Sequence, residues 1–271
     1  MDENKFSEVQ MAELRFQQEL SLMQDKLKEG NEPFFYTHEE KTEFSFLLVH
    51  GFSACPWEMK DLGEYLYKKG YNVYGMILDG HGTKEEDLLK VKWEDWYQSV
   101  EDTYELTKLI GDRVIIVGLS TGGDLALRLA ADKPELSGVV SLSSAIFFKD
   151  WKIVFSGIGK YFIKYNSRPL SPVLKHYYYE NRAVSAIYEV YKLSGITKKA
   201  LKNVEQPVLI IQSINDETIK VESSEYIHKN IGSKNKKLIL LENGPHVLTS
   251  FENPKQNEVF ESISFWVENF K

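Results

Sequence analysis

The chain has 271 residues, of which 42% are hydrophobic and 27% charged, and these proportions are ordinary for a soluble globular protein. Its formal net charge of −7 argues against a general affinity for nucleic acid or for an anionic membrane. A single cysteine, Cys55, excludes an intramolecular disulfide and suits a reducing cytoplasm, where we expect the protein to act. There is no signal-peptide pattern at the start, and no later run approaches the roughly 18 apolar residues of a membrane span. We therefore expect neither secretion nor an integral membrane segment.

The first predicted element is an amphipathic helix in an N-terminal extension over residues 1–30. Apolar residues recur there at spacings of three and four, at Val9, Ala12, Phe16, Leu20, Met23 and Leu27. Gly30 is a typical C-terminal stop. The polar face mixes acidic and basic side chains and so lacks the basic character of a membrane-surface helix. We expect the helix to pack on its own chain, with a dimer contact as the alternative, so monomer and homodimer both stay open.

From residue 31 to residue 271, short apolar strands alternate with helical stretches. The predicted strands cover residues 44–49, 71–78, 114–117, 138–142, 206–212 and 237–241. The predicted helices cover residues 58–69, 93–110, 124–131, 223–231 and 257–270. This alternation predicts an α/β domain with a mostly parallel central sheet and helices on both faces. Polar residues follow several of the strands, and ligands of parallel sheets bind at that edge.

The strongest motif is Gly118-Leu119-Ser120-Thr121-Gly122, which joins a predicted strand to a predicted helix. A serine on so tight a turn has strained backbone, and the positions two before and two after it have little room for a Cβ atom. The helix that follows directs its N-terminal amides toward a negative charge formed at the serine. Ser120 is therefore the candidate nucleophile. Asp124, early in that helix, is expected to be a charge that favours the helix dipole.

A nucleophilic serine needs a base and a group that orients the base. Asp216 follows the strand that ends at residue 212, and His246 follows the strand that ends at residue 241. The chain order serine, aspartate, histidine is the order found in α/β-hydrolases. Glu217 is the rival to Asp216 as the orienting carboxylate. The sequence thus predicts a triad of Ser120, Asp216 and His246.

The backbone N–H of Phe52, in the turn after the first predicted strand, is a candidate donor to an oxyanion. The second candidate is the N–H of Thr121, directly after the nucleophile. Two amides directed at a developing negative charge stabilise the transition state by about 3 kcal/mol each. Cys55 has no base assigned to it and is expected to be a buried structural thiol. No residues have metal-ligand spacing and no glycine-rich phosphate loop occurs, so we expect no metal and no cofactor.

Taken together, these motifs resemble those of the α/β-hydrolase superfamily, most of all its compact bacterial carboxylesterases and monoacylglycerol lipases. The similarity runs from about Pro33 to the C-terminus and is carried by His50-Gly51-Phe52, Asp79-Gly80-His81-Gly82, Gly118-Leu119-Ser120-Thr121-Gly122-Gly123, Asp216 and His246. The resemblance implies that His50 and His81 hold loops together by hydrogen bonds. Relatives often carry a larger apolar residue where Thr121 stands, so a slightly more polar pocket is expected here.

The family places a cap over the active site, and the resemblance implies a small helical cap at about residues 147–202. This stretch is rich in aromatic residues. We expect most of these rings to form the core of the cap and only two or three to touch substrate. The basic side chains of the stretch are expected to form a solvated face, namely Lys160, Lys164, Arg168 and Lys175.

The resemblance further implies a serine hydrolase that cleaves small-molecule carboxylic esters through an acyl-enzyme intermediate. The single Gly51-Phe52 pair resembles the branch that handles short to medium acyl chains, and monoacylglycerols are included among the candidate substrates. A thioesterase, an acyltransferase, a peptidase or a C–C hydrolase would use the same triad. A ligand-binding protein on a hydrolase scaffold is the remaining alternative, which the filled triad positions disfavour.

Overall fold

The computed structural model describes residues 6–269. Residues 1–5 of the predicted N-terminal extension, and residues 270 and 271 at the end of the predicted hydrolase domain, lie outside the described residues. No helix within residues 6–269 combines the length and the apolar character needed to cross a membrane.

Residues 6–269 contain a seven-stranded central sheet in the order β1-β3-β2-β4-β5-β8-β9. Its strands are β1 (Phe34–Tyr36), β2 (Thr42–Val49), β3 (Asn72–Gly75), β4 (Gly111–Leu119), β5 (Gly138–Leu142), β8 (Val208–Ser213) and β9 (Lys236–Leu241). β1 pairs antiparallel with β3, and every other pairing in the sheet is parallel. The predicted mostly parallel sheet is therefore confirmed, with β1 as an antiparallel edge strand that the sequence did not reveal.

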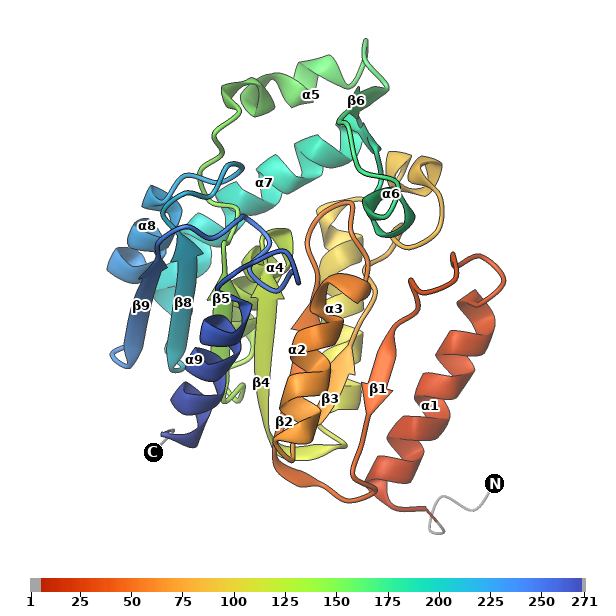
Figure 1. The fold of residues 1–271 in the computed structure, drawn as a ribbon, viewed down its shortest axis with the longest axis vertical. Helices are drawn as coiled ribbons and strands as arrows, with labels where there is room; N and C mark the ends of the chain where they lie inside the picture. Colours follow the sequence, from red (N-terminus) through yellow and green to blue (C-terminus); the bar gives the residue numbers. More distant parts are fainter. Residues whose placement is uncertain (1–5, 270–271) are drawn as a thin grey trace.

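Helices cover both faces of this sheet (Figure 1). One face carries α2 (Trp57–Lys68) and α9 (Gln256–Glu268), and the other carries α3 (Trp93–Thr107), α4 (Thr121–Asp132) and α8 (Glu222–Asn230). The central strands are apolar on both sides, as expected of buried parallel strands. In β2, for example, Leu47 and Val49 face one core while Phe46 and Leu48 face the other.

The N-terminal helix α1 (Glu8–Met23) lies beside the β1 edge of the sheet (Figure 1). It begins with a capping box in which Ser7 and Gln10 exchange side-chain to backbone hydrogen bonds. The ring of Phe16 stacks on Phe35 at 5.1 Å and meets Tyr74 edge-on at 5.4 Å. The helix therefore packs on its own chain. It ends well before the stop predicted at Gly30, which instead forms a later turn with positive φ.

Between β5 and β8 the chain forms a separate layer above the carboxyl ends of the strands (Figure 1). Its elements are η3 (Trp151–Phe155), α5 (Ser156–Gly159), β6 (Tyr165–Ser167), α6 (Leu174–Tyr177), β7 (Asn181–Ala183) and α7 (Val184–Ala200). We call this layer the cap. It is not purely helical, because β6 and β7 pair as a small antiparallel sheet. α7 packs against α4, so the cap is anchored to the helix that follows Ser120.

Asp124, in the first turn of α4, is fully buried, and neither of its carboxylate oxygens has a well-formed hydrogen bond. Burial raises its pKa to about 8, which the nearby Ala145 amide and Lys198 only partly oppose. The prediction of a charge that favours the helix dipole is therefore wrong. A carboxyl group so far from solvent is held mainly in its neutral form at pH 7.

We expect Asp124→Asn to stabilise the protein most at alkaline pH. The folded-state pKa of about 8 lies above the ordinary 3.8, so folding takes up a proton between about pH 4 and pH 8. The stability of the unmodified protein falls as pH rises through that window, and the loss is complete above pH 8. Asn avoids this loss and should raise the unfolding free energy by about 2 kcal/mol or more at pH 9, and by less at pH 5.

Urea unfolding followed by circular dichroism at both pH values measures this difference. Asp112→Asn, at an exposed position on β4, is the matched control and should change little at either pH. An effect of Asp124→Asn that is equal at pH 5 and pH 9 would contradict the assignment.

Candidate active site

Ser120 occupies the sharp turn between β4 and α4. Its backbone has φ 54° and ψ −116°, a conformation that side-chain-bearing residues rarely adopt. Both flanking glycines are required by crowding: a Cβ atom on Gly118 would overlap the backbone of Gly122, and one on Gly122 would overlap the carbonyl groups of Val49 and His50. The crowding predicted from the sequence is thus present. The sharp turn directs the Ser120 side chain away from the carboxyl edge of the sheet, toward the cavity.

His246 lies between Ser120 and Asp216. Its Nε2 atom is 3.0 Å from the Ser120 Oγ, and its Nδ1 atom is 2.7 Å from Asp216 Oδ2. The chain positions of these groups are far apart, but β4, β8 and β9 all end at the same edge of the sheet. The structure therefore brings all three predicted triad residues together. The arrangement of nucleophile, base and orienting carboxylate suits proton transfer from the serine hydroxyl.

Asp216 is fully buried, and its second oxygen, Oδ1, accepts the backbone N–H groups of Thr218 and Ile219, each at 2.8 Å. Burial alone would raise its pKa, but His246 and the two amides together hold the pKa below its usual value. The carboxylate thus stays ionised beside the imidazole. Glu217, the rival carboxylate, instead accepts the backbone N–H of His246 at 3.2 Å.

The turn after β2 places the predicted oxyanion donor Phe52 next to this group. Gly51 and Phe52 line the same cavity as Ser120, Thr121 and His246. Within residues 6–269, no acceptor is found for the N–H of Phe52 or of Thr121. The two amides are therefore free to bind an oxygen atom from a substrate.

Two buried histidines hold this turn. The backbone N–H of Leu78 donates to His50 Nε2 at 3.1 Å, and that of Ser53 donates to His81 Nε2 at 3.0 Å. Since both Nε2 atoms accept, the protons are on Nδ1, which face the carbonyls of Gly51 and Asp79. Burial lowers both pKa values, that of His81 to about 4, so both rings are neutral. Their loop-holding role is the one expected.

Glu58 is a member of the site that the sequence analysis missed. It is buried in the first turn of α2, where Oε2 accepts the Gly51 N–H at 2.6 Å and Oε1 accepts the Tyr178 hydroxyl at 2.9 Å. Burial raises its pKa, and these two donors partly oppose the rise. A signal was available, because Glu58 stands on the apolar stripe that continues at Leu62 and Leu66. A carboxylate in such a stripe indicates a buried partner.

Cys55, near the same turn, has the structural role expected of it. Its thiol is buried and donates to Asn31 Oδ1 at 3.2 Å, and burial raises its pKa. Within the described part of the chain, no cluster of three or more His, Cys, Asp or Glu side chains is arranged to hold a metal ion.

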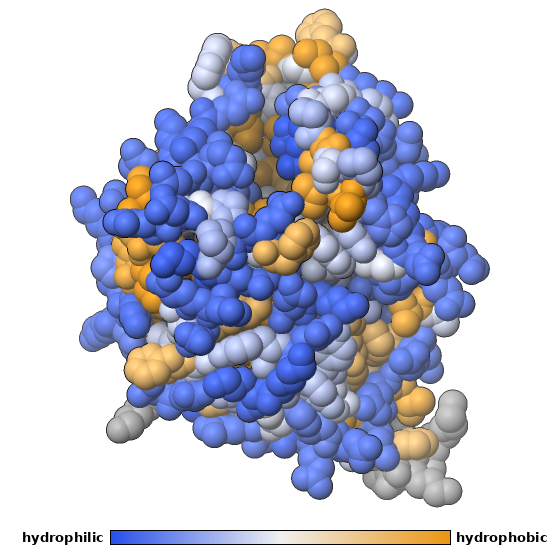
Figure 2. Space-filling view, in the orientation of Figure 1, coloured by the Kyte–Doolittle hydropathy of each residue, from blue (hydrophilic) through white to orange (hydrophobic). Residues whose placement is uncertain are grey.

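Above Ser120 lies a cavity of about 460 Å³, between the sheet edge and the cap. Figure 2 shows a recess with an apolar interior in this upper part of the molecule, below α5. Apolar side chains of the cap form part of its wall, namely Ile153, Phe155, Ile163, Val184, Ile187 and Val190. Such a lining suits a hydrocarbon chain of limited length.

Two expectations about the cap are wrong. Many of its aromatic rings do not form a core: the side chains of Trp151, Tyr161 and Phe162 are 66%, 76% and 83% exposed. The segment that carries them is short and lies on top of the molecule, so little of it can be covered (Figure 1). Arg168, expected on a solvated face, instead lines the cavity, directly after the end of β6.

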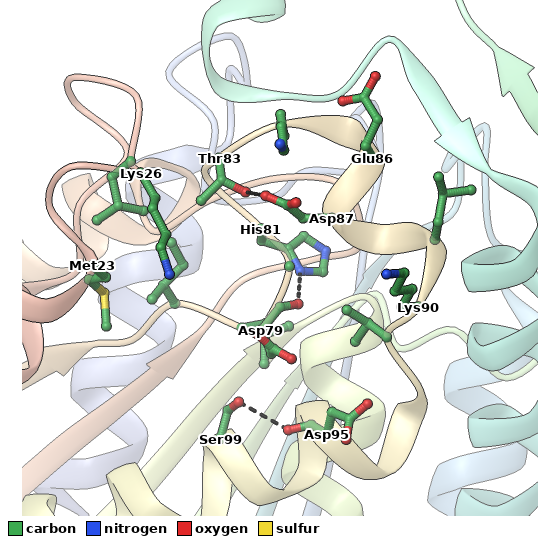
Figure 3. A pocket seen from close by; sticks show the side chains of 17 residues that line it. Met23, Lys26, Asp79, His81, Thr83, Glu86, Asp87, Lys90, Asp95 and Ser99 are labelled. Carbon is green, nitrogen blue, oxygen red and sulfur yellow. Dashed lines mark hydrogen bonds between the residues drawn. The ribbon is translucent and has the colours of Figure 1, made fainter.

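A second cleft, of about 1150 Å³, lies beside the loop that follows β3 (Figure 3). Its hydroxyl groups are occupied locally, since Ser99 donates to the Asp95 carbonyl at 3.0 Å and Thr83 donates to Asp87 at 2.7 Å. The ring of His81 is held by backbone groups, as described above. No serine–histidine pair is found in the described residues of this cleft, so the candidate reactive site is the one at Ser120.

The chain belongs to the α/β-hydrolase superfamily of serine hydrolases. Residues 40–183, more than half of the chain, match a family described as serine aminopeptidase, S33. The thermostable monoacylglycerol lipase of Bacillus sp. (strain H-257) is 32% identical over 89% of this chain and 96% of its own length. A carboxylesterase of Bacillus subtilis (strain 168) is 26% identical over 80% of this chain and 89% of its own.

Solved structures agree with this placement. The structure of a metagenome-derived lipolytic enzyme superposes with a TM-score of 0.82 at 26% identity, over 90% of this chain and 100% of that chain. A monoglyceride lipase from Saccharomyces cerevisiae has the same fold, with a TM-score of 0.77 at 17% identity, over 88% of this chain and 91% of its own. These relatives support ester hydrolysis as the activity of the chain.

We expect Glu58→Ala to lower kcat for p-nitrophenyl butyrate by about 10- to 100-fold, with a much smaller change in KM. The loss follows because the Gly51 amide and the Tyr178 hydroxyl both lose their acceptor, which loosens the turn that carries the Phe52 amide. Glu58→Gln keeps an acceptor and a polar partner at these positions and should stay within about threefold of the unmodified protein.

Steady-state kinetics on purified variants decides this, with Lys60→Ala, at an exposed position of the same helix, as the control. If Gln impairs kcat as much as Ala does, hydrogen bonding to the turn is not what Glu58 contributes.

Proposed function

We propose that the chain hydrolyses carboxylic esters with short to medium acyl chains through Ser120, His246 and Asp216. The observation that supports this most directly is the hydrogen-bonded series from Asp216 through His246 to Ser120, below a largely apolar cavity of limited volume. Monoacylglycerols are candidate substrates, because the relative from Bacillus sp. is a monoacylglycerol lipase.

In the proposed mechanism, His246 removes the Ser120 proton as Oγ attacks the ester carbonyl carbon. The N–H groups of Phe52 and Thr121 bind the oxyanion of the tetrahedral intermediate. His246, oriented by Asp216, then gives its proton to the leaving alcohol, and an acyl-Ser120 ester remains. Water, deprotonated by the same imidazole, attacks that ester and releases the acid and free Ser120.

The cap, at about residues 147–202 of a hydrolase domain that spans residues 31–271, would set the acyl length in this proposal. The N-terminal extension, residues 1–30, would contribute packing on the sheet edge and no chemistry. A cytoplasmic location agrees with the buried, unpaired thiol of Cys55.

The proposal predicts that Ser120→Ala and His246→Ala each lower kcat for the best p-nitrophenyl ester by about 10⁴-fold or more, without loss of fold. The substrate series runs from acetate to palmitate, and we expect activity to peak at short or medium chains. Ser143→Ala, a buried serine outside the triad, is the matched control for folding and activity.

A serine-directed phosphonate should label the unmodified protein and not Ser120→Ala. Thioesters, aminoacyl p-nitroanilides and esters with an added acceptor alcohol test the thioesterase, peptidase and acyltransferase alternatives. Substantial ester hydrolysis by either triad variant would overturn the mechanism. Labelling without any ester hydrolysis would assign the nucleophile to one of those alternatives, and the absence of both would favour a binding protein.

A further inference from the structure

The cavity above Ser120 contains two guanidinium groups that the proposed mechanism does not use. Arg182 lies on β7, opposite Asn166 of β6, and Arg168 follows the end of β6. Both arginine side chains line the same cavity as Ser120 and His246. The β6–β7 pair that carries them lies above the sheet edge, within the cap (Figure 1).

Neither guanidinium forms an ion pair with the described part of the chain. Within residues 6–269, no carboxylate lies within ion-pair distance of Arg168 or Arg182. The Nε atoms of both side chains are shielded from solvent and have no hydrogen-bond acceptor. The Arg168 guanidinium donates a long hydrogen bond to Ser53 Oγ, at 3.4 Å, and lies over the ring of Tyr178. By contrast, Lys175 and Lys192 of the cap pair with Glu180 and Glu189.

Burying the two guanidinium groups together is costly. Burial lowers the pKa of Arg168 and lowers that of Arg182 to about 10, and repulsion by Arg168 contributes to the shift at Arg182. Removing a cation from water without a partner is unfavourable, and placing two near each other adds to the cost. An anion that enters the cavity and accepts hydrogen bonds from both guanidinium groups would offset most of this free-energy cost.

The acidic groups of the cavity are not suited to this task. The carboxylate of Glu58 attracts Arg168, but its oxygens already accept from Gly51 and Tyr178. Asp150 attracts Arg182 from beyond ion-pair distance, and Lys152 brings a further positive charge to the same lining. The cap side of the cavity therefore has an excess of positive charge.

We propose that Arg168 and Arg182 bind an anionic group of the substrate, a carboxylate or a phosphate, so that the preferred substrates are esters bearing such a group apart from the scissile carbonyl. This rests on the proposed ester hydrolysis at Ser120. The planar guanidinium fork matches the oxygens of either anion. The apolar walls of the cavity accommodate the hydrocarbon part of the same molecule.

The test compares matched esters that differ in the anionic group. The first pair is p-nitrophenyl hydrogen glutarate, which carries a carboxylate on its acyl side, and the neutral p-nitrophenyl pentanoate. The second pair is 1-decanoylglycerol 3-phosphate, which carries a phosphate on its alcohol side, and the neutral 1-decanoylglycerol. In at least one pair, kcat/KM of the unmodified protein should be about tenfold or more higher for the anionic ester. The pair that shows the preference identifies the source of the anion.

Arg182→Gln should lower that anionic-to-neutral ratio by about tenfold or more, because hydrogen bonds to a charged group are lost. Arg168→Gln provides the same test if the first variant does not fold, as judged by circular dichroism. The matched control is Lys164→Gln, which removes an exposed charge of the cap outside the cavity and should leave the ratio within twofold. A ratio near or below one in both pairs, or one that Arg182→Gln and Arg168→Gln leave unchanged, would overturn the proposal.

Binding to Ser120→Ala separates this proposal from the proposed function. Titration calorimetry with the same four esters measures affinity without turnover. If the unmodified protein hydrolyses none of them, ester hydrolysis fails. Tighter binding of an anionic ester by Ser120→Ala, lost on adding Arg182→Gln, would still support the anion site, and equal binding of charged and neutral esters would overturn it.

Discussion

The site depends on a backbone contact between the turn after β2 and the turn that joins β4 to α4. β2 and β4 are neighbouring parallel strands, and the first turn of α4 lies directly against the carbonyl groups at the end of β2. The contact is close enough that Gly122 cannot carry a side chain. It fixes the distance between the turn that bears Ser120 and the turn that bears Phe52, and the buried side chains of His50, His81 and Glu58 hold the second turn in place.

Two sets of buried polar side chains near this contact differ in their hydrogen bonding. Behind the turn, His50, His81 and Glu58 have their hydrogen-bonding partners within the chain, and such a satisfied network is rigid. On the cavity side, Arg168 and Arg182 leave buried donors without acceptors. The difference separates groups that maintain the shape of the site from groups that face a ligand.

The sequence was sufficient to predict the parallel sheet and the grouping of Ser120, Asp216 and His246 at one edge of it, because each of these residues follows an apolar strand within a few positions. It was not sufficient for β1, whose three residues are too few to show a period. Glu58 could have been found, because it stands on the apolar stripe of its helix. Arg168 could not, because a long side chain can lie in solvent or turn inward, and only the packing of the cap decides which. The short cap segment likewise gave no sign that its aromatic rings are exposed.

The position of the cap within the sheet order has a consequence for folding. β5 and β8 are neighbours in the sheet, yet the whole cap separates them in the chain. Closing a loop of that length costs more entropy than pairing β2 with β3 or β4 with β5, whose partners are closer in the chain. During folding, β5 is therefore expected to present an unpaired edge until the segment that contains the cap has closed and β8 pairs with β5. Since Asp216 and His246 follow β8 and β9, their approach to Ser120 depends on the closure of this loop.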